Sequence, residues 1–333
     1  MTVASAVRRR NPAPDNAAPT SEWQRLSTAS GWSERTTYQG LRVAANELAT
    51  AHARRVSVVR AMVVGVVGVS VALACEGRDG PGPRQPAEIG QWIWSSTDSV
   101  VYAASLRTIP KVVPTVWIGT IHGTRDGRVT GRLALSPRIA ALPRVGVTVR
   151  FEDDFSAVWE SRTDSAVAVA LAPSLASMLG AASATGVEIT EVQLDYDVPE
   201  RLLPRWSAVV AALSRDVLRG RAVWVTSLVS HVRQREYGDL FRGRVRGHIL
   251  QVFDTGDKMS LSYADQLERL ASRHRMPFRL GVAAFERQLA NGTTTDHRAW
   301  FSAARVMSRS PWYRGLWVFP GGHAWVPFAE RAP

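Results

Sequence analysis

The stretch "ITEVQLDYDVPE" (residues 189–200) alternates apolar and polar side chains and stops at Pro199. The apolar side chains are Val192, Leu194 and Tyr196, and the polar ones between them are Gln193, Asp195 and Asp197. A period of two predicts a β-strand with one apolar face and one face that carries an amide and two carboxylates. The polar face either meets water on a half-exposed strand or lines a cavity in which the carboxylates carry out chemistry. The rest of the sequence distinguishes these two interpretations.

Apolar runs of strand length recur along the chain from residue 89 onward, separated by stretches of helical character. The strand-like runs are 89–96, 112–121, 145–152, 191–198, 222–230, 247–254, 278–285 and 315–322, and amphipathic stretches include 174–186, 203–220 and 262–275. Eight such repeats predict an α/β fold of the (β/α)8 (TIM) barrel type. An open doubly wound sheet is the alternative, but no glycine-rich phosphate loop follows an early strand. We expect residues 122–142 to form a long loop before a helix.

The barrel fold gives the two aspartates a position. In such a barrel one side-chain parity faces the helices and the other faces the interior, and active sites lie at the C-terminal mouth. Val192, Leu194 and Tyr196 suit the helix layer, so Asp195 and Asp197 point inward. Carboxylates two residues apart on a strand have Cα atoms about 6.5–7 Å apart, so each acts on the charge of the other. One of them is then expected to hold its proton near neutral pH, as a general acid must.

Further polar and aromatic residues end the other predicted strands at the same mouth. These are Trp94, Glu152, Gln251, Phe253, Asp254, Glu286, Trp317 and Trp325. Flat aromatic rings cover the apolar faces of pyranoses while carboxylates bind hydroxyls. The mouth is therefore predicted to bind carbohydrate, as a polysaccharide or an oligosaccharide.

Three motifs on successive strands, "VQLDYDVP", "VTSLVS" and "LQVFDTG", resemble the bacterial family of domain of unknown function 3142. The resemblance covers most of residues 88–330 and implies a glycosidase-type barrel. A more distant similarity is to family 18 glycoside hydrolases, the chitinase-like barrels. That similarity implies that Phe253 and Asp254 match an aromatic–Asp pair on the sixth strand, and that Trp317 or Trp325 is the tryptophan flooring the sugar site.

The same similarity implies roles for the polar face of the fourth strand. Asp195 falls on the aspartate that orients the acetamido group of the substrate, and Asp197 on the glutamate that acts as the acid. Gln193 replaces a first inner aspartate and cannot relay a proton, and Asp197 is one methylene shorter than the family's glutamate. These departures put substrate-assisted hydrolysis by the chitinase route in doubt.

Composition limits the other functions. The 333 residues carry a net charge of +12 that comes mostly from arginine, because Lys111 and Lys258 are the only lysines. The charge forms no basic stripe and accompanies no nucleic-acid motif, so we expect no nucleic-acid partner. The histidines show no metal-ligand spacing, and no G-x-S-x-G elbow or cofactor motif is present, so we expect neither metal nor cofactor.

The N-terminal part of the chain indicates export. Arginines precede an apolar run that ends in "VALAC", which resembles the lipobox of bacterial lipoproteins, with Cys75 as the lipidation site. We therefore divide the chain into an N-terminal extension (1–53), a signal peptide with lipobox or a membrane anchor (54–75), a linker (76–87) and the barrel (88–330). Cys75 is the only cysteine, which rules out an intramolecular disulfide.

The position of Met1 far upstream of the apolar run leaves two interpretations. Either the start is mis-assigned and true initiation lies nearer Val56, Val59 or Met62, or the run is a signal anchor behind a small cytoplasmic tail. Both place the residues after Cys75 outside the cytoplasm, in the periplasm or at the cell surface.

Two functions follow as hypotheses. The first is glycoside hydrolysis by Asp195 and Asp197, with help from Asp254. The second is a non-catalytic glycan-binding or envelope-scaffold lipoprotein with a degenerate barrel. An open mouth with converging carboxylates favours the enzyme, and salt bridges across the mouth favour the second function.

Overall fold

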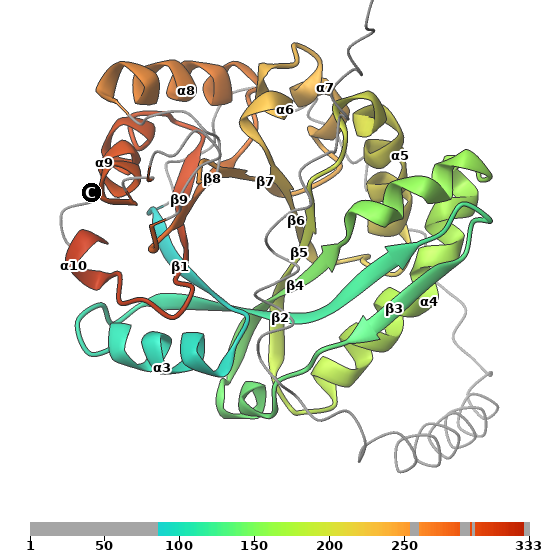
Figure 1. Cartoon of the computed structure of the whole chain (residues 1–333), viewed down its shortest axis with the longest axis horizontal. Helices are drawn as coiled ribbons and strands as arrows, with labels where there is room; N and C mark the ends of the chain where they lie inside the picture. The colour runs from blue at the N-terminus through green and yellow to red at the C-terminus, as the bar shows by residue number, and fades with distance from the viewer. Residues whose placement is uncertain (1–85, 254–259, 287–293, 295–296, 330–333) are drawn as a thin grey trace, which may run out of the picture. The chain divides into compact units, whose positions relative to one another are not determined.

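The structure is a computed structural model that describes residues 86–253, 260–286, 294 and 297–329. Eight parallel strands form a closed barrel, because β1 pairs with both β2 and β9 (Figure 1). They are β1 (Glu88–Ile93), β2 (Val112–Gly123), β4 (Arg144–Phe151), β5 (Glu188–Tyr196), β6 (Ala222–Ser227), β7 (Gly247–Gln251), β8 (Phe278–Ala283) and β9 (Tyr313–Phe319). The predicted (β/α)8 barrel is confirmed, and all eight predicted strands are present.

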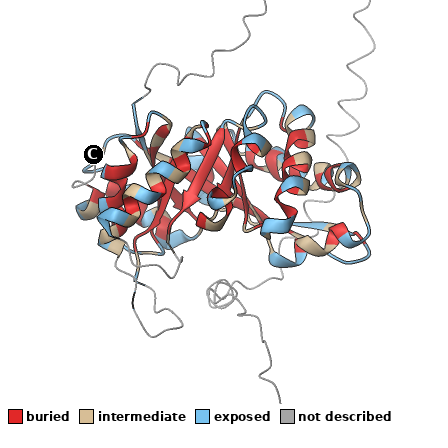
Figure 2. Cartoon of the chain, turned by 90° about the horizontal axis from the view of Figure 1, so that it is seen from above, coloured by how far each residue is buried: buried red, intermediate tan, exposed pale blue. Residues whose placement is uncertain are grey.

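Helices surround the barrel, with their exposed residues on the outer faces and the strands buried inside (Figure 2). They are α3 (Ser96–Ser105), α4 (Asp164–Ser183), α5 (Leu203–Arg215), α6 (Val229–Arg233), α7 (Tyr237–Phe241), α8 (Leu261–Arg273), α9 (His297–Met307) and α10 (Val326–Ala329). Helix α4 begins at residue 164 and not at 174 as predicted, because Thr163 caps it by accepting a hydrogen bond from the Ala166 amide.

The structure corrects the prediction that residues 122–142 form a loop, because this region contains an additional strand. Strand β3 (Val129–Leu133) pairs antiparallel with the end of β2 and is followed by a short 3-10 helix, η1 (Pro137–Ala141). The turn between the strands places Gly127 at φ +82°, a conformation that favours glycine. The Asp126–Gly127 pair is a hairpin signal that the loop prediction overlooked.

Helix α4 is the one helix in the described part of the chain that has the length and apolar composition of a membrane span. Seven of its residues are buried in the core, among them Val167, Leu171 and Leu175. A helix that packs against a barrel can be as apolar as a membrane span. Because these residues are buried in the core, we assign α4 to the helical layer.

The barrel interior is a packed core, because tryptophans of three strands each occupy the space next to a glycine of another strand. A Cβ atom built on those glycines would lie 2.2–3.0 Å from indole carbons, in the pairs Gly90 and Trp317, Gly247 and Trp224, and Gly281 and Trp92. All three indoles are almost fully buried. The large rings therefore fill the barrel interior below its mouth, so that within the barrel only the C-terminal end can receive a ligand.

Candidate binding site at the barrel mouth

A single guanidinium joins the two aspartates of β5. Strands β4 and β5 pair with Arg150 opposite Asp195, and both side chains lie on the inward face. Arg150 Nη1 donates to Asp195 Oδ2 at 3.1 Å, and Arg150 Nη2 donates to Asp197 Oδ2 at 2.9 Å. The structure therefore brings the two aspartates together as predicted, but as an ion-paired cluster.

The four carboxylate oxygens differ in what they leave for a ligand. Asp195 Oδ1 also accepts a hydrogen bond, from Gln251 Nε2 at 3.0 Å, so both oxygens of this carboxylate are engaged. Asp197 Oδ1 is buried without a hydrogen-bond partner in the described part of the chain. The side chain of Asp197 is 32% exposed, against 7% for Asp195. Asp197 is therefore the more exposed of the two carboxylates, and Arg150 ties it to Asp195.

The electrostatics of the cluster follow from its burial. Burial raises the pKa of the Asp195 carboxyl, Arg150 opposes this rise, and the charge of Asp197 adds to it. Burial lowers the pKa of Arg150, but the two carboxylates more than offset this and raise it. A raised carboxyl pKa suits a general acid, yet both Asp195 oxygens already accept hydrogen bonds. Asp195 is therefore not placed to hand a proton to a ligand.

Gln193 lies one step deeper in the barrel than Asp195 and is fully buried. Its Oε1 accepts from Trp92 Nε1 at 2.7 Å, and its Nε2 donates to Glu191 Oε1 at 2.7 Å. Because its amide is engaged on both sides, Gln193 braces the floor of the site and does not reach a ligand, which corrects its predicted binding role.

Aromatic rings line the mouth on the side of β1 and β2. Trp94 stacks on Trp117 with ring centroids 5.3 Å apart and an interplanar angle of 11°, and Phe319 meets Trp94 edge-on at 5.8 Å. Phe253 stacks on Phe319 at 6.2 Å. Trp94, Trp117 and Phe253 are half-buried, and Trp94 Nε1 has no hydrogen-bond partner among the described residues. Together they offer a ring surface with one unused donor.

Two residues of this site, Arg150 and Trp117, are absent from the predicted set. Both share the inward parity of their strands, Arg150 with Thr148 and Trp117 with Thr115. The parity of these two strands is therefore the signal that would have found them.

Glu152 and Glu286 do not join the cluster. Glu152 follows β4 half-buried and precedes a 3-10 helix, η2 (Asp153–Glu160), and no side-chain hydrogen bond of Glu152 is present. Glu286 is exposed, with its Oε1 4.0 Å from His297 Nδ1. Asp254 lies outside the described residues.

The prediction that Trp317 or Trp325 floors a sugar site is corrected by their burial. Both indoles are fully buried. Trp317 Nε1 donates to Thr115 Oγ1 at 3.0 Å inside the barrel, and Trp325 Nε1 donates to Gln91 Oε1 at 2.8 Å. Gln91 has the parity opposite to Trp92, so Trp325 packs outside the barrel wall. Neither ring is within reach of a ligand at the mouth.

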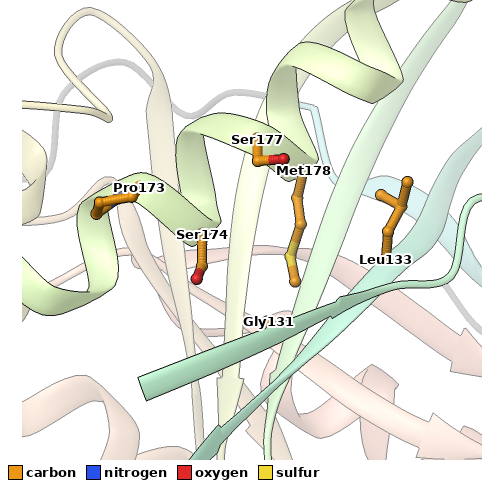
Figure 3. A pocket seen from close by; sticks show the side chains of 6 residues that line it. All are labelled: Gly131, Leu133, Pro173, Ser174, Ser177 and Met178. Atoms are coloured by element: carbon orange, nitrogen blue, oxygen red, sulfur yellow. The ribbon is translucent and has the colours of Figure 1, made fainter. Parts of the chain in front are cut away.

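Two cavities lie elsewhere on the barrel. One of about 230 Å³ separates β3 from α4 and has no charged side chain in its wall (Figure 3). It is lined by Gly131, Leu133, Pro173, Ser174, Ser177 and Met178. The other, of about 500 Å³, opens near the N-terminal ends of β6 and β7. Within the described residues, no group of three or more His, Cys, Asp or Glu side chains is arranged to hold a metal ion.

Comparison with solved structures places the fold among glycoside hydrolase barrels. The spore cortex-lytic enzyme SleL of Bacillus megaterium QM B1551 matches with a TM-score of 0.53 and 8% identity over 75% of both chains. The GH18 chitinase ChiB of Flavobacterium johnsoniae matches with a TM-score of 0.51 and 9% identity over 74% of this chain and 93% of that one. A class V chitinase of Pseudomonas fluorescens Pf-5 matches with a TM-score of 0.51 and 12% identity over 74% and 99%.

These likenesses show the fold alone, a (β/α)8 barrel of the kind found in these chitinases and in the cortex-lytic enzyme. No family model matches the chain, and no curated protein does. Membership in the family of domain of unknown function 3142 therefore stays a prediction.

Proposed function

We propose that the chain is a carbohydrate-binding barrel protein that holds a sugar at its C-terminal mouth. The observation that carries the proposal is the Arg150 bridge, which engages three of the four oxygens of the cluster together with Gln251 and leaves Asp197 Oδ1 buried and without a hydrogen-bond partner among the described residues. In this proposal Asp197 accepts a hydrogen bond from a sugar hydroxyl, and the half-buried face of Trp94 covers a pyranose ring. The chitinase and cortex-lytic neighbours agree with a carbohydrate ligand.

Hydrolysis by the aspartate pair is the second candidate. A two-carboxylate glycosidase needs one carboxyl to deliver a proton and the other to act on the sugar or on water, about 5–5.5 Å or 6.5–9.5 Å apart. One guanidinium holds both carboxyls here, and Asp195 has no oxygen left. The buried, unpartnered Asp197 Oδ1 and the raised pKa of Asp195 are the observations that favour turnover.

Binding and turnover are separated by measuring both on the same panel of polysaccharides. We expect the wild type to bind at least one glycan, and Asp197→Asn and Trp94→Ala each to weaken that binding by about tenfold, a loss of about 1.4 kcal/mol. Glu188→Gln is the matched control, because Glu188 lies on the same strand at the opposite end of the barrel. Binding that both mouth variants retain in full contradicts the proposal. Reducing ends released by the wild type but not by Asp197→Asn identify a hydrolase instead.

Export with a lipid on Cys75 is the second part of the proposal. The support is sequence alone: an arginine flank, an apolar run and the "VALAC" motif, all within residues 54–75. Intact mass of the protein from its native membrane fraction is expected to show a lipidated chain that begins at Cys75. A mature chain that retains residues 1–53 excludes the lipoprotein interpretation.

A further inference from the structure

The larger cavity, near the N-terminal ends of β6 and β7, has a wall with charge of a single sign. It measures about 500 Å³, and four of its lining residues are arginines: Arg215, Arg221, Arg244 and Arg246. None of its lining residues is acidic. Asp216, next to Arg215, is exposed and is not part of the wall. Like charges gathered around one hollow repel each other unless an anion lies between them.

The backbone places these arginines by two tight turns. Arg215 ends α5, and Gly220 at φ +76° then turns the chain so that Arg221 stands just before β6. Gly243, also at φ +76°, turns the chain before Arg244. Arg244 Nη1 donates to Ser207 Oγ at 2.7 Å, which fixes one edge of the guanidinium. The turns therefore bring together arginines that are far apart in the sequence.

Two further observations concern the groups in and beside the cavity wall. Ser214, which lines the cavity, has a buried Oγ without a hydrogen-bond partner among the described residues. Burial and the charge of Arg246 together lower the pKa of Arg314, at the start of β9. A buried hydroxyl without a partner beside several guanidinium groups is an arrangement that an oxyanion would complete.

We propose that this cavity binds a ligand bearing phosphate groups. Guanidinium groups match phosphate with paired, planar hydrogen bonds, and several of them suit a multiply charged oxyanion. The volume is ample for a phosphate and its water, since one water occupies about 30 Å³ of liquid. The cavity opens at the end of the barrel where the chain enters β1, so either a lipid headgroup or phosphate in solution can supply the group.

Binding is tested on the full chain with defined probes. Titration calorimetry with inorganic pyrophosphate covers phosphate in solution, and sedimentation with vesicles covers headgroups, comparing phosphatidylglycerol mixed with phosphatidylcholine against pure phosphatidylcholine. We expect Arg221→Gln and Arg244→Gln each to weaken binding by about tenfold, as for the loss of a hydrogen bond to a charged group. Ser214→Ala, which changes no charge, is expected to weaken it by a few-fold.

Arg144→Gln is the matched control, because it also removes one exposed positive charge from the N-terminal end of a strand but does not line the cavity. The Arg144→Gln variant is expected to bind each probe with an affinity within twofold of that of the wild type. Pyrophosphate binding without vesicle binding assigns the site to phosphate in solution, and the reverse assigns it to a membrane headgroup; either supports the proposal. No binding of any probe, or an equal loss in Arg144→Gln, overturns it. Unchanged melting temperatures of the variants confirm that they fold.

Discussion

Two buried arginines occupy opposite ends of one barrel, and each holds two carboxylates. At the base, Arg279 Nη1 lies 2.6 Å from Glu191 Oε1, and its Nη2 lies 3.0 Å from Glu88 Oε2. At the mouth, Arg150 holds its two aspartates at 3.1 and 2.9 Å. The chemistry of the two clusters is the same, so any difference in role must come from their surroundings.

The surroundings enclose the Arg279 guanidinium more completely than that of Arg150, although Glu88 at the base is 52% exposed and Asp197 at the mouth is 32% exposed. The Arg279 guanidinium lies between the rings of Trp224 and Trp317, 3.7 and 3.6 Å from their centroids, and its side chain is 4% exposed. Its Nε has no hydrogen-bond partner in the described chain, but the two rings enclose it. Arg150 is 16% exposed, and the buried Oδ1 of its partner Asp197 has no hydrogen-bond partner among the described residues. The enclosed guanidinium of Arg279 therefore contributes to stability, and in our proposal the more exposed Arg150 cluster contributes to recognition.

The largest effect is expected at the base. Arg279→Met leaves Glu191 as a buried carboxylate without its counter-ion, and breaking a buried pair costs about 3–5 kcal/mol. The loss of the cation between two indoles adds to this cost. Urea unfolding measures the change in the free energy of unfolding. A loss below about 1 kcal/mol would show that the cluster at the base does not stabilise the fold.

Arg150→Met is expected to cost less, about 2 kcal/mol, because the partly exposed Asp197 can regain water. The same variant should abolish glycan binding, since it frees both aspartates from their common support. Urea unfolding and glycan binding measured together test both expectations. A greater loss of stability for Arg150→Met than for Arg279→Met would reverse the comparison.

The alternation of side chains along the strands was enough to predict the barrel and the inward direction of Asp195 and Asp197. Alternation gives the face of a side chain but not its depth along the barrel axis, which is set by the register between strands. Trp317 has the inward parity expected of it, yet β9 pairs with β8 so that Trp317 lies opposite Gly281, below the mouth. For the same reason, the contact of Arg150 with β5 could not be predicted, because it depends on the pairing of β4 with β5.

The pH dependence of stability distinguishes the mouth from a surface carboxylate. Burial raises the pKa of Asp195 above 3.8, so above that pH the folded protein binds more protons than the unfolded chain. Its free energy of unfolding therefore falls, relative to Asp195→Asn, as the pH rises through this range. At pH 7 we expect Asp195→Asn to be within about 1 kcal/mol of the wild type, or more stable.

Asp126→Asn is the control of opposite sign. A hydrogen bond from Thr124 lowers the pKa of Asp126, so its contribution is present above pH 3.8 and is lost as the pH falls. Urea unfolding of the wild type, Asp195→Asn and Asp126→Asn between pH 3.5 and 7 gives the difference in the free energy of unfolding between the wild type and each variant. A wild type whose free energy of unfolding rises relative to that of Asp195→Asn as the pH rises would mean that Arg150, and not burial, dominates the titration of Asp195.

The smallest effect is expected from the ion pair of Arg144 and Glu188. This pair lies on β4 and β5, the two strands that also carry Arg150 and Asp195. Arg144 Nε lies 3.1 Å from Glu188 Oε2, and β4 and β5 pair these residues directly, as they pair Arg150 with Asp195. The side chains are 67% and 61% exposed, so water and salt screen their attraction. Glu188→Gln should change the free energy of unfolding by less than about 0.5 kcal/mol, and by still less in high salt. Urea unfolding at low and high ionic strength checks this. Since strand pairing and distance match those of Arg150 and Asp195, a cost as large as that of Arg150→Met would mean that burial does not decide the strength of these pairs.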